Sequence, residues 1–256
     1  MITRGQSIAF GTTSLATLFA AMHSFADNQA WLTHGVPPVG TSTLLWAGSF
    51  MVAWALMTTA MTLPSLTGLL EATSRVGGSV ATFASGLMTL GVWMVAGFVV
   101  WFLLFESASW LSALPPGGIE RYAAIALLLA AAYQVSPFAR GCQEQCARPL
   151  GIIARHWGNA SSLPSAALWI GLDYGWNCVG CCVPMIVIMF VVGMGDVRWL
   201  AAMALLMVTQ KNTHWGSVIA HISAVGLVAA GGAILVGWWE PDLLSLRELC
   251  GNRLAL

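Results

Sequence analysis

Long apolar segments, separated by short polar ones, run along almost the whole chain. Seven of them approach or exceed the length of about 20 mostly apolar residues with which an α-helix crosses a bilayer. They cover residues 8–25, 43–70, 80–104, 121–135, 164–192, 197–209 and 215–239. No internal repeat or low-complexity segment interrupts the series. We therefore expect one all-α domain over residues 1–256, a polytopic transmembrane helical bundle of about seven spans, with six as the alternative count.

The first apolar segment has two readings. It follows Arg4, and the sequence Ser24-Phe25-Ala26 resembles a signal-peptide cleavage site. We expect it to be a retained helix.

Charged residues are rare in this chain. They make up 8% of the 256 residues, whereas an ordinary soluble domain carries roughly 25%. A soluble globule of this length could not cover its surface with so few charges, so the lipid bilayer is the expected partner. Ten Lys and Arg balance ten Asp and Glu, which leaves no net field to attract nucleic acid.

The positions of the basic residues suggest an orientation. With seven spans and a cytoplasmic N-terminus, six of the ten Lys and Arg fall in inner segments. The loop expected over 136–163 contains three Arg and one Glu, and its charge opposes transfer across a membrane. We therefore expect an integral, multi-pass protein of a bacterial inner (plasma) membrane, with this loop in the cytoplasm.

The densest group of chemically distinctive residues lies in the fifth apolar segment. Cys178, Cys181, Cys182 and Met185 share one face of a helix, because residues three and four apart lie on the same side. Such thiolate and thioether donors suit Cu(I), and less specifically Zn²⁺ or an iron–sulfur cluster. Pro184 has no N–H to donate to the carbonyl four residues earlier, so a kink there would open space beside the cysteines. The alternative is ordinary packing, since Cys and Met are common in membrane helices.

A second cysteine pair, Cys142 and Cys146, lies in the expected loop. If the segment is helical, the spacing of four places both sulfurs on one side. Arg140 and Arg148 nearby would favour the thiolate, the form that binds metal or attacks a disulfide. A metal or redox role competes with an inert pair.

Met57 and Met61 form a further soft pair at helical spacing in the second segment. Methionines in such stripes usually fill the core. Both lie near the middle of their span, as Cys178 and Cys181 do, so the sequence permits a shared site within the membrane.

Three ordered motifs carry a resemblance to a known family. They are Ala60-Met61-Thr62-Leu63-Pro64-Ser65, then Tyr133-Gln134-Val135-Ser136-Pro137 leading into Cys142-x₃-Cys146-x₂-Pro149-Leu150, and Gly175-x₂-Cys178-x₂-Cys181-Cys182 before a Met-rich run. Over about 54–211 the chain resembles the bacterial family of predicted metal-binding integral membrane proteins, a domain of unknown function sometimes labelled copper chaperone. Relatives usually have His where this chain has Tyr174, and commonly Met at the position of Thr62.

We expect an integral membrane protein that handles or delivers Cu(I) through Cys and Met ligands, with zinc as the second candidate metal. The expected ligands are Cys178, Cys181, Cys182, Met185, Met57, Met61, Cys142 and Cys146. The alternatives are an accessory subunit of a larger membrane complex and a membrane thiol–disulfide redox protein. Partners would be other membrane subunits or a metal-receiving protein. No catalytic set is apparent, so an enzyme is the less expected class.

Overall fold

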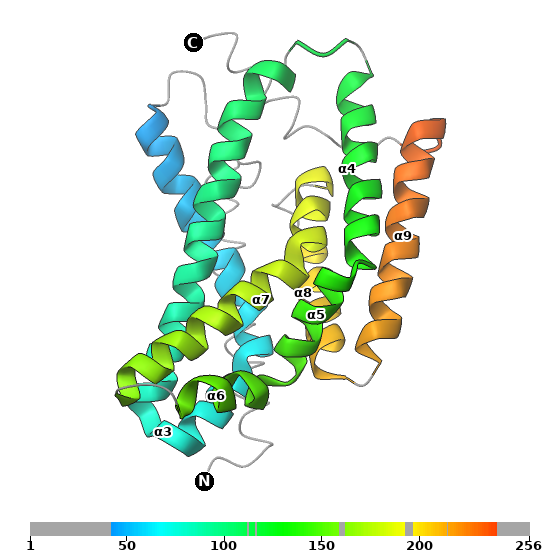
Figure 1. Cartoon of the computed structure of the whole chain (residues 1–256). Coiled ribbons are helices and arrows are strands. Elements are labelled where there is room, and N and C mark those ends of the chain that lie inside the picture. The colour runs from blue at the N-terminus through cyan, green and yellow to red at the C-terminus, as the bar shows by residue number, and fades with distance from the viewer. Residues whose placement is uncertain are drawn as a thin grey trace.

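The structure is a computed structural model that describes residues 42–111, 113–115, 117–158, 162–192, 197–213 and 215–239. This part of the chain is all helical and contains no strand (Figure 1). Its helices are α3 (Thr43–Leu111), α4 (Gly118–Gln134), α5 (Pro137–Ala147), α6 (Pro149–Trp157), α7 (Leu163–Val192), α8 (Val197–Asn212) and α9 (Gly216–Val236). The first expected span, 8–25, lies outside the described residues.

Helix α3 is two helices joined by a turn at Gly78. This residue has φ 68° and ψ −161°, a backbone conformation that a residue with a side chain rarely adopts. Figure 1 shows the chain running down to this turn and back up beside itself. The turn lies between the second and third apolar segments, where the sequence predicts a connection.

Four helices are long and apolar enough to cross a membrane. They are Thr43–Leu63, Ser65–Ser107, Leu163–Val191 and Gly216–Val236. A fifth is obtained if α4 and α5, which are bent by 62° at their junction, count as one broken span. Helix α8 has 16 residues and falls short of the roughly 20 that a full crossing requires. The described residues thus fit a multi-pass membrane protein, and the expected count of seven spans is not confirmed.

The loop predicted over 136–163 is mostly helical, which corrects that expectation. Helix α5 begins with Ser136 as its N-cap, whose Oγ accepts from the Ala139 amide at 3.2 Å, and Pro137 occupies the first turn. The Arg140 guanidinium donates to the Val135 carbonyl at the end of α4. The charged residues of this segment lower its apolar character, so the sequence analysis did not recognise the apolar positions that pack against the other helices.

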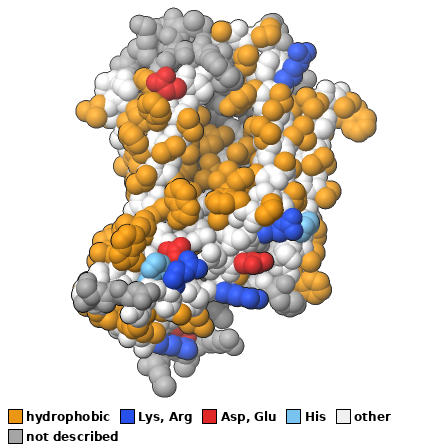
Figure 2. Space-filling view, viewed as in Figure 1, with side chains coloured by type: hydrophobic (Ala, Val, Ile, Leu, Met, Phe, Trp, Pro, Cys, Tyr) orange, Lys and Arg blue, Asp and Glu red, His pale blue; other side chains and the backbone are white. Residues whose placement is uncertain are grey.

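Two buried cores meet along α7. The first, here called the sulfur-rich core, joins α3, α5, α6, α7 and α8 and contains five cysteines and six methionines among its fully buried residues. The second, here called the small-residue core, lies mainly between α4 and α9 and is built from alanines with Leu127, Val191, Leu227 and Ile234. Figure 2 shows a broad band of hydrophobic side chains on the outer face, with most of the visible charged groups gathered below it.

Candidate functional site

Cysteines from two helices meet inside the sulfur-rich core. The Cys181 Sγ lies 4.0 Å from the Cys146 Sγ of α5 and 3.8 Å from the Cys182 Sγ of its own helix. The Cys181 thiol also donates to the Cys178 carbonyl at 3.2 Å. All four side chains are buried and are free thiols. We call Cys146, Cys178, Cys181 and Cys182 the cysteine cluster.

The helical spacing of α7 explains why its cysteines face inward together. The predicted face with Cys178, Cys181, Cys182 and Met185 is buried, and so are Tyr174 before it and Met189 after it. Helix α5 brings Cys146 to the stripe because α4 bends sharply at Val135 and directs α5 across α7.

The other cysteine of α5 has a different environment. Cys142 is buried and packs on Gly180, where an added Cβ would stand only 2.8 Å from the Cys142 Sγ. The predicted pair is therefore helical and turned inward, but Cys146 alone has an Sγ in contact with another thiol. Arg140, which the sequence analysis placed near these thiols as a charge, is engaged with the Val135 carbonyl.

A tyrosine compensates for the proline in α7. Pro184 cannot donate to the Gly180 carbonyl, and the Tyr133 hydroxyl of α4 donates to that oxygen instead, at 2.7 Å. Figure 1 shows α7 changing direction in its second half, which contains Pro184. The freed carbonyl is thereby satisfied within the helix bundle, one and two residues before Cys181 and Cys182. The sequence analysis quoted Tyr133 within a motif without recognising this role.

Lys211 supplies the charge next to the thiols. Its Nζ lies 2.9 Å from the Cys178 Sγ, and the side chain is 5% exposed at the end of α8. A buried ammonium is costly unless it is paired. The sequence analysis treated this residue only as a loop charge. The signal that would have found it is that Lys211 is the single lysine of the chain and follows an apolar segment.

Thioethers lie in the same core as the cysteine cluster. Met57, Met61 and Met185, the three predicted methionine ligands, are all buried there. A thioether in direct contact with the cluster comes from Met207 of α8, whose Sδ lies 3.8 Å from the Cys182 Sγ. This residue is 1% exposed and was not selected from the sequence.

Tyr174 connects two helices below the cluster. Its hydroxyl donates to the Ser65 carbonyl of α3 at 3.2 Å, and the side chain is 1% exposed. Tyr174, the position at which the resemblance described above implies His, therefore holds α7 against α3 in this chain.

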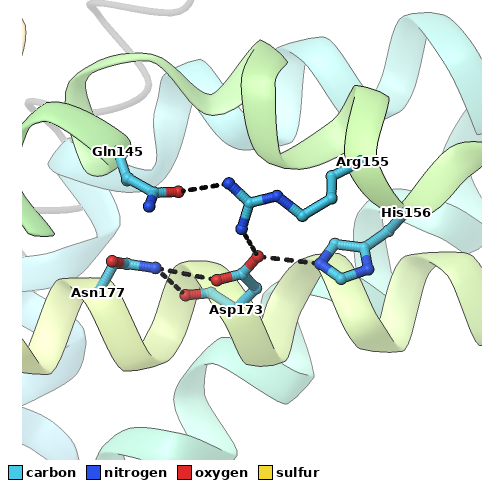
Figure 3. Close-up of polar contacts among 5 residues, drawn as sticks. All are labelled: Gln145, Arg155, His156, Asp173 and Asn177. Carbon is cyan, nitrogen blue, oxygen red and sulfur yellow. Dashed lines mark hydrogen bonds and ion pairs between the residues drawn. The ribbon is translucent and has the colours of Figure 1, made fainter. Parts of the chain in front are cut away.

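A polar network joins α6 to α5 and α7 (Figure 3). The Asp173 carboxylate of α7 accepts from Arg155 at 3.0 Å, from the His156 Nε2 at 2.9 Å and from the Asn177 amide at 3.0 Å. Arg155 also donates to the Gln145 amide oxygen at 3.1 Å. We call these five residues the polar network. Asn177 directly precedes Cys178, so charged and polar groups come within one residue of the thiols.

The described residues contain no group of three or more His, Cys, Asp and Glu side chains already placed to hold a metal ion. The cysteine cluster instead offers thiols in close pairs, with a thioether and an ammonium beside them.

This combination of long apolar helices around a buried thiol cluster is compatible with a multi-pass membrane protein that has thiols and thioethers in its interior. The chain belongs to the family described as copper chaperone, PpoB2, whose model matches residues 51–234. Comparison with curated proteins and with solved structures finds no match to either.

Proposed function

We propose that this protein binds Cu(I) at the cysteine cluster within the membrane and delivers it to a receiving protein. The observation that carries the proposal is the sulfur spacing of 3.8 Å and 4.0 Å around Cys181. Metal–thiolate bonds of about 2.3 Å, as in zinc sites, place two ligand sulfurs about 3.8 Å apart in a tetrahedral site and about 4.0 Å apart in a trigonal one. Small movements of these side chains would therefore suffice to enclose a metal ion.

The donor types favour Cu(I) among soft metals. Thiolates and thioethers together select Cu(I), which accepts few ligands. Met207 next to Cys182 offers a thioether at the cluster itself, and Met185, Met57 and Met61 lie in the same core. The family description as copper chaperone supports the same metal.

The charge of the site also favours a monovalent ion. Two thiolates with one Cu(I) carry one net negative charge, and the Lys211 ammonium at 2.9 Å from the Cys178 Sγ balances it. Two thiolates with Zn²⁺ are already neutral, and the ammonium would then be a buried charge without a partner. Zinc remains the competing metal for a site with three thiolates.

We assign the polar network and the N-terminal half of α7 to the cytoplasmic side. The basic residues of 136–163 support this orientation through the positive-inside rule. A cytoplasmic donor or acceptor would then approach Cys146 and Cys178 from the side of α5 and α6. Cys142, which packs on Gly180, would support α5 rather than bind the ion.

Metal analysis of the full-length protein, purified in detergent with a reductant and supplied with Cu(I), tests the proposal. We expect about one bound copper, and a decrease of about tenfold or more in Cys181→Ser or Cys182→Ser, because a serine hydroxyl is a poor ligand for a soft ion. Cys250→Ser is the matched control, since Cys250 lies in the polar C-terminal segment outside the described residues. Equal copper in all three variants and the parent would contradict the proposal.

Thiol–disulfide exchange is the second candidate, because the Cys146 and Cys181 sulfurs face each other at 4.0 Å from two different helices. Counting free thiols in protein purified without reductant separates the two functions. Five free thiols at the described cysteines fit metal binding, whereas a loss of the Cys146 and Cys181 thiols together fits exchange.

A further inference from the structure

Methionines continue from the cysteine cluster along α7 and α8, away from the polar network. Met185 and Met189 follow the cysteines on α7, and Met203 precedes Met207 on α8. Their side chains are 4%, 5%, 8% and 1% exposed, respectively. All four belong to the sulfur-rich core, so they form one buried set with the thiols.

Two contacts fix how these helices run past each other. Cys178 lies against Lys211, and four residues further along α7, Cys182 lies against Met207, four residues earlier on α8. The helices are therefore antiparallel. One more step of four along each helix leads to Met203 on α8 and to residue 186, next to Met185, on α7, and both methionines are buried in the sulfur-rich core.

Along α7, the sulfurs of Cys178, Cys182, Met185 and Met189 follow each other in steps of three or four residues, or about 4.5–6 Å of helix axis. The path from Cys178 to Met189 covers 11 residues of α7, which is about 16 Å of helix axis. It begins beside the polar network and ends three residues before the end of α7 at Val192.

The chemistry of the donors changes along this path. Thiols and an ammonium occupy its first turn. From Val183 to Val192, the α7 sequence contains no ionisable residue. A Cu(I) ion on thioethers alone keeps its positive charge in an apolar interior, which is costly. It would therefore remain there only briefly, whereas thiolates would hold it.

We propose that Met207, Met185, Met203 and Met189 form a thioether path over which Cu(I) leaves the cysteine cluster towards the opposite face of the membrane. This inference rests on the proposed function, since it takes its ion from the cluster. Each step is a ligand exchange: a Cu–S bond to a thiolate or thioether breaks, a Cu–S bond to the next thioether forms, and copper stays Cu(I).

The full-length protein in liposomes that enclose a Cu(I)-specific chelating dye tests the path, with ascorbate and Cu(I) outside. Met189→Leu/Met203→Leu keeps an apolar side chain of similar volume at both positions but removes two donors. We expect dye loading to slow by about tenfold, because leucine cannot bind copper, while the copper bound at equilibrium in detergent stays within about twofold of the parent. Met94→Leu is the matched control, since Met94 packs against the same core from α3.

Loading at the parent rate in the double variant, or equal slowing in Met94→Leu, would overturn the path. A parent protein that binds Cu(I) but never loads the dye would overturn the path and leave the proposed function intact. A parent protein that binds no Cu(I) would overturn both. If the double variant fails to fold, Met189→Leu alone carries the same expectation with a smaller slowing.

Discussion

The two cores of this protein differ in the kinds of side chain that fill them. Between α4 and α9, alanines and glycines bring the helices close together; an added Cβ at Gly231 would lie 3.1 Å from the Ala124 carbonyl oxygen. Close contact of small residues is a common way to hold helices together in a bilayer. Around α7, by contrast, the sulfur-rich core buries thiols, thioethers and an ammonium.

This difference suggests a division of roles: the small-residue core holds helices together, and the sulfur-rich core contains the groups that can bind a metal. Buried polar and ionisable groups are expensive inside a membrane, so their concentration in one core makes that core the candidate for metal binding. Tyr133 connects the two, because it stands on α4 and donates to Gly180 on α7. If this division is correct, changes in the sulfur-rich core will alter metal binding, and changes in the small-residue core will alter stability alone.

The largest effect is expected from Lys211→Met. Removing one member of a buried charged pair typically costs several kcal/mol, so the Cu(I) affinity should fall by about a hundredfold, or about 3 kcal/mol. Competition of the detergent-purified protein against a Cu(I) chelator of known affinity measures the change. Lys211→Arg, which keeps the charge with a different shape, is the control and should lose less. An unchanged affinity in Lys211→Met would remove the lysine from the site.

Tyr133→Phe should mainly affect stability, by leaving the Gly180 carbonyl without a donor. A buried unsatisfied group costs about 1–3 kcal/mol, which unfolding in mixed micelles can measure. Pro184→Ala restores the missing N–H to the same carbonyl. The cost of Tyr133→Phe should therefore be smaller in the Pro184→Ala background, and an equal cost in both backgrounds would show that the hydroxyl acts elsewhere.

Much of this arrangement follows from the sequence, and the exceptions have two causes. The spacing of Cys178, Cys181 and Cys182 predicts one buried face, and the structure confirms it. The connection between 70 and 80 is also where the sequence predicts it, at Gly78. Both depend on local spacing, which a sequence displays directly.

The contacts that the sequence did not predict depend on how helices far apart in the chain align. Lys211 meets Cys178 across 33 positions, and Met207 meets Cys182 across 25. Helical periodicity says which face of α8 is apolar but not which turn of α7 lies against it. The segment 136–163 was predicted as a loop for another reason, since its three Arg lowered its apolar character although Ile152 and Ile153 are buried.

A smaller effect is expected in the small-residue core, where two adjacent glycines allow a matched comparison. Gly231→Ala forces a Cβ to within 3.1 Å of the Ala124 carbonyl oxygen, whereas the Cβ of Gly232→Ala meets nothing within 4 Å. Both gain the same helix propensity. Gly231→Ala should therefore be less stable than Gly232→Ala by about 1 kcal/mol, with bound copper unchanged in both. Loss of copper in Gly231→Ala would show that the two cores are not independent.

The smallest effect is expected in the polar network. The Arg155 and Asp173 side chains are 54% and 21% exposed, so their ion pair at 3.0 Å is largely open to solvent. Such pairs contribute about 0.2–1 kcal/mol, and salt screens them. A double-mutant cycle of Arg155→Met and Asp173→Asn, measured by unfolding at low and high salt, should give a coupling of about 0.5 kcal/mol that shrinks as salt rises. The copper bound at equilibrium should change by less than about twofold, because neither side chain touches a thiol in the contacts that define the cluster. If Asp173→Asn instead lowered bound copper as strongly as Lys211→Met, the carboxylate would act on the ion itself, and the functional region would extend from the sulfurs into the polar network.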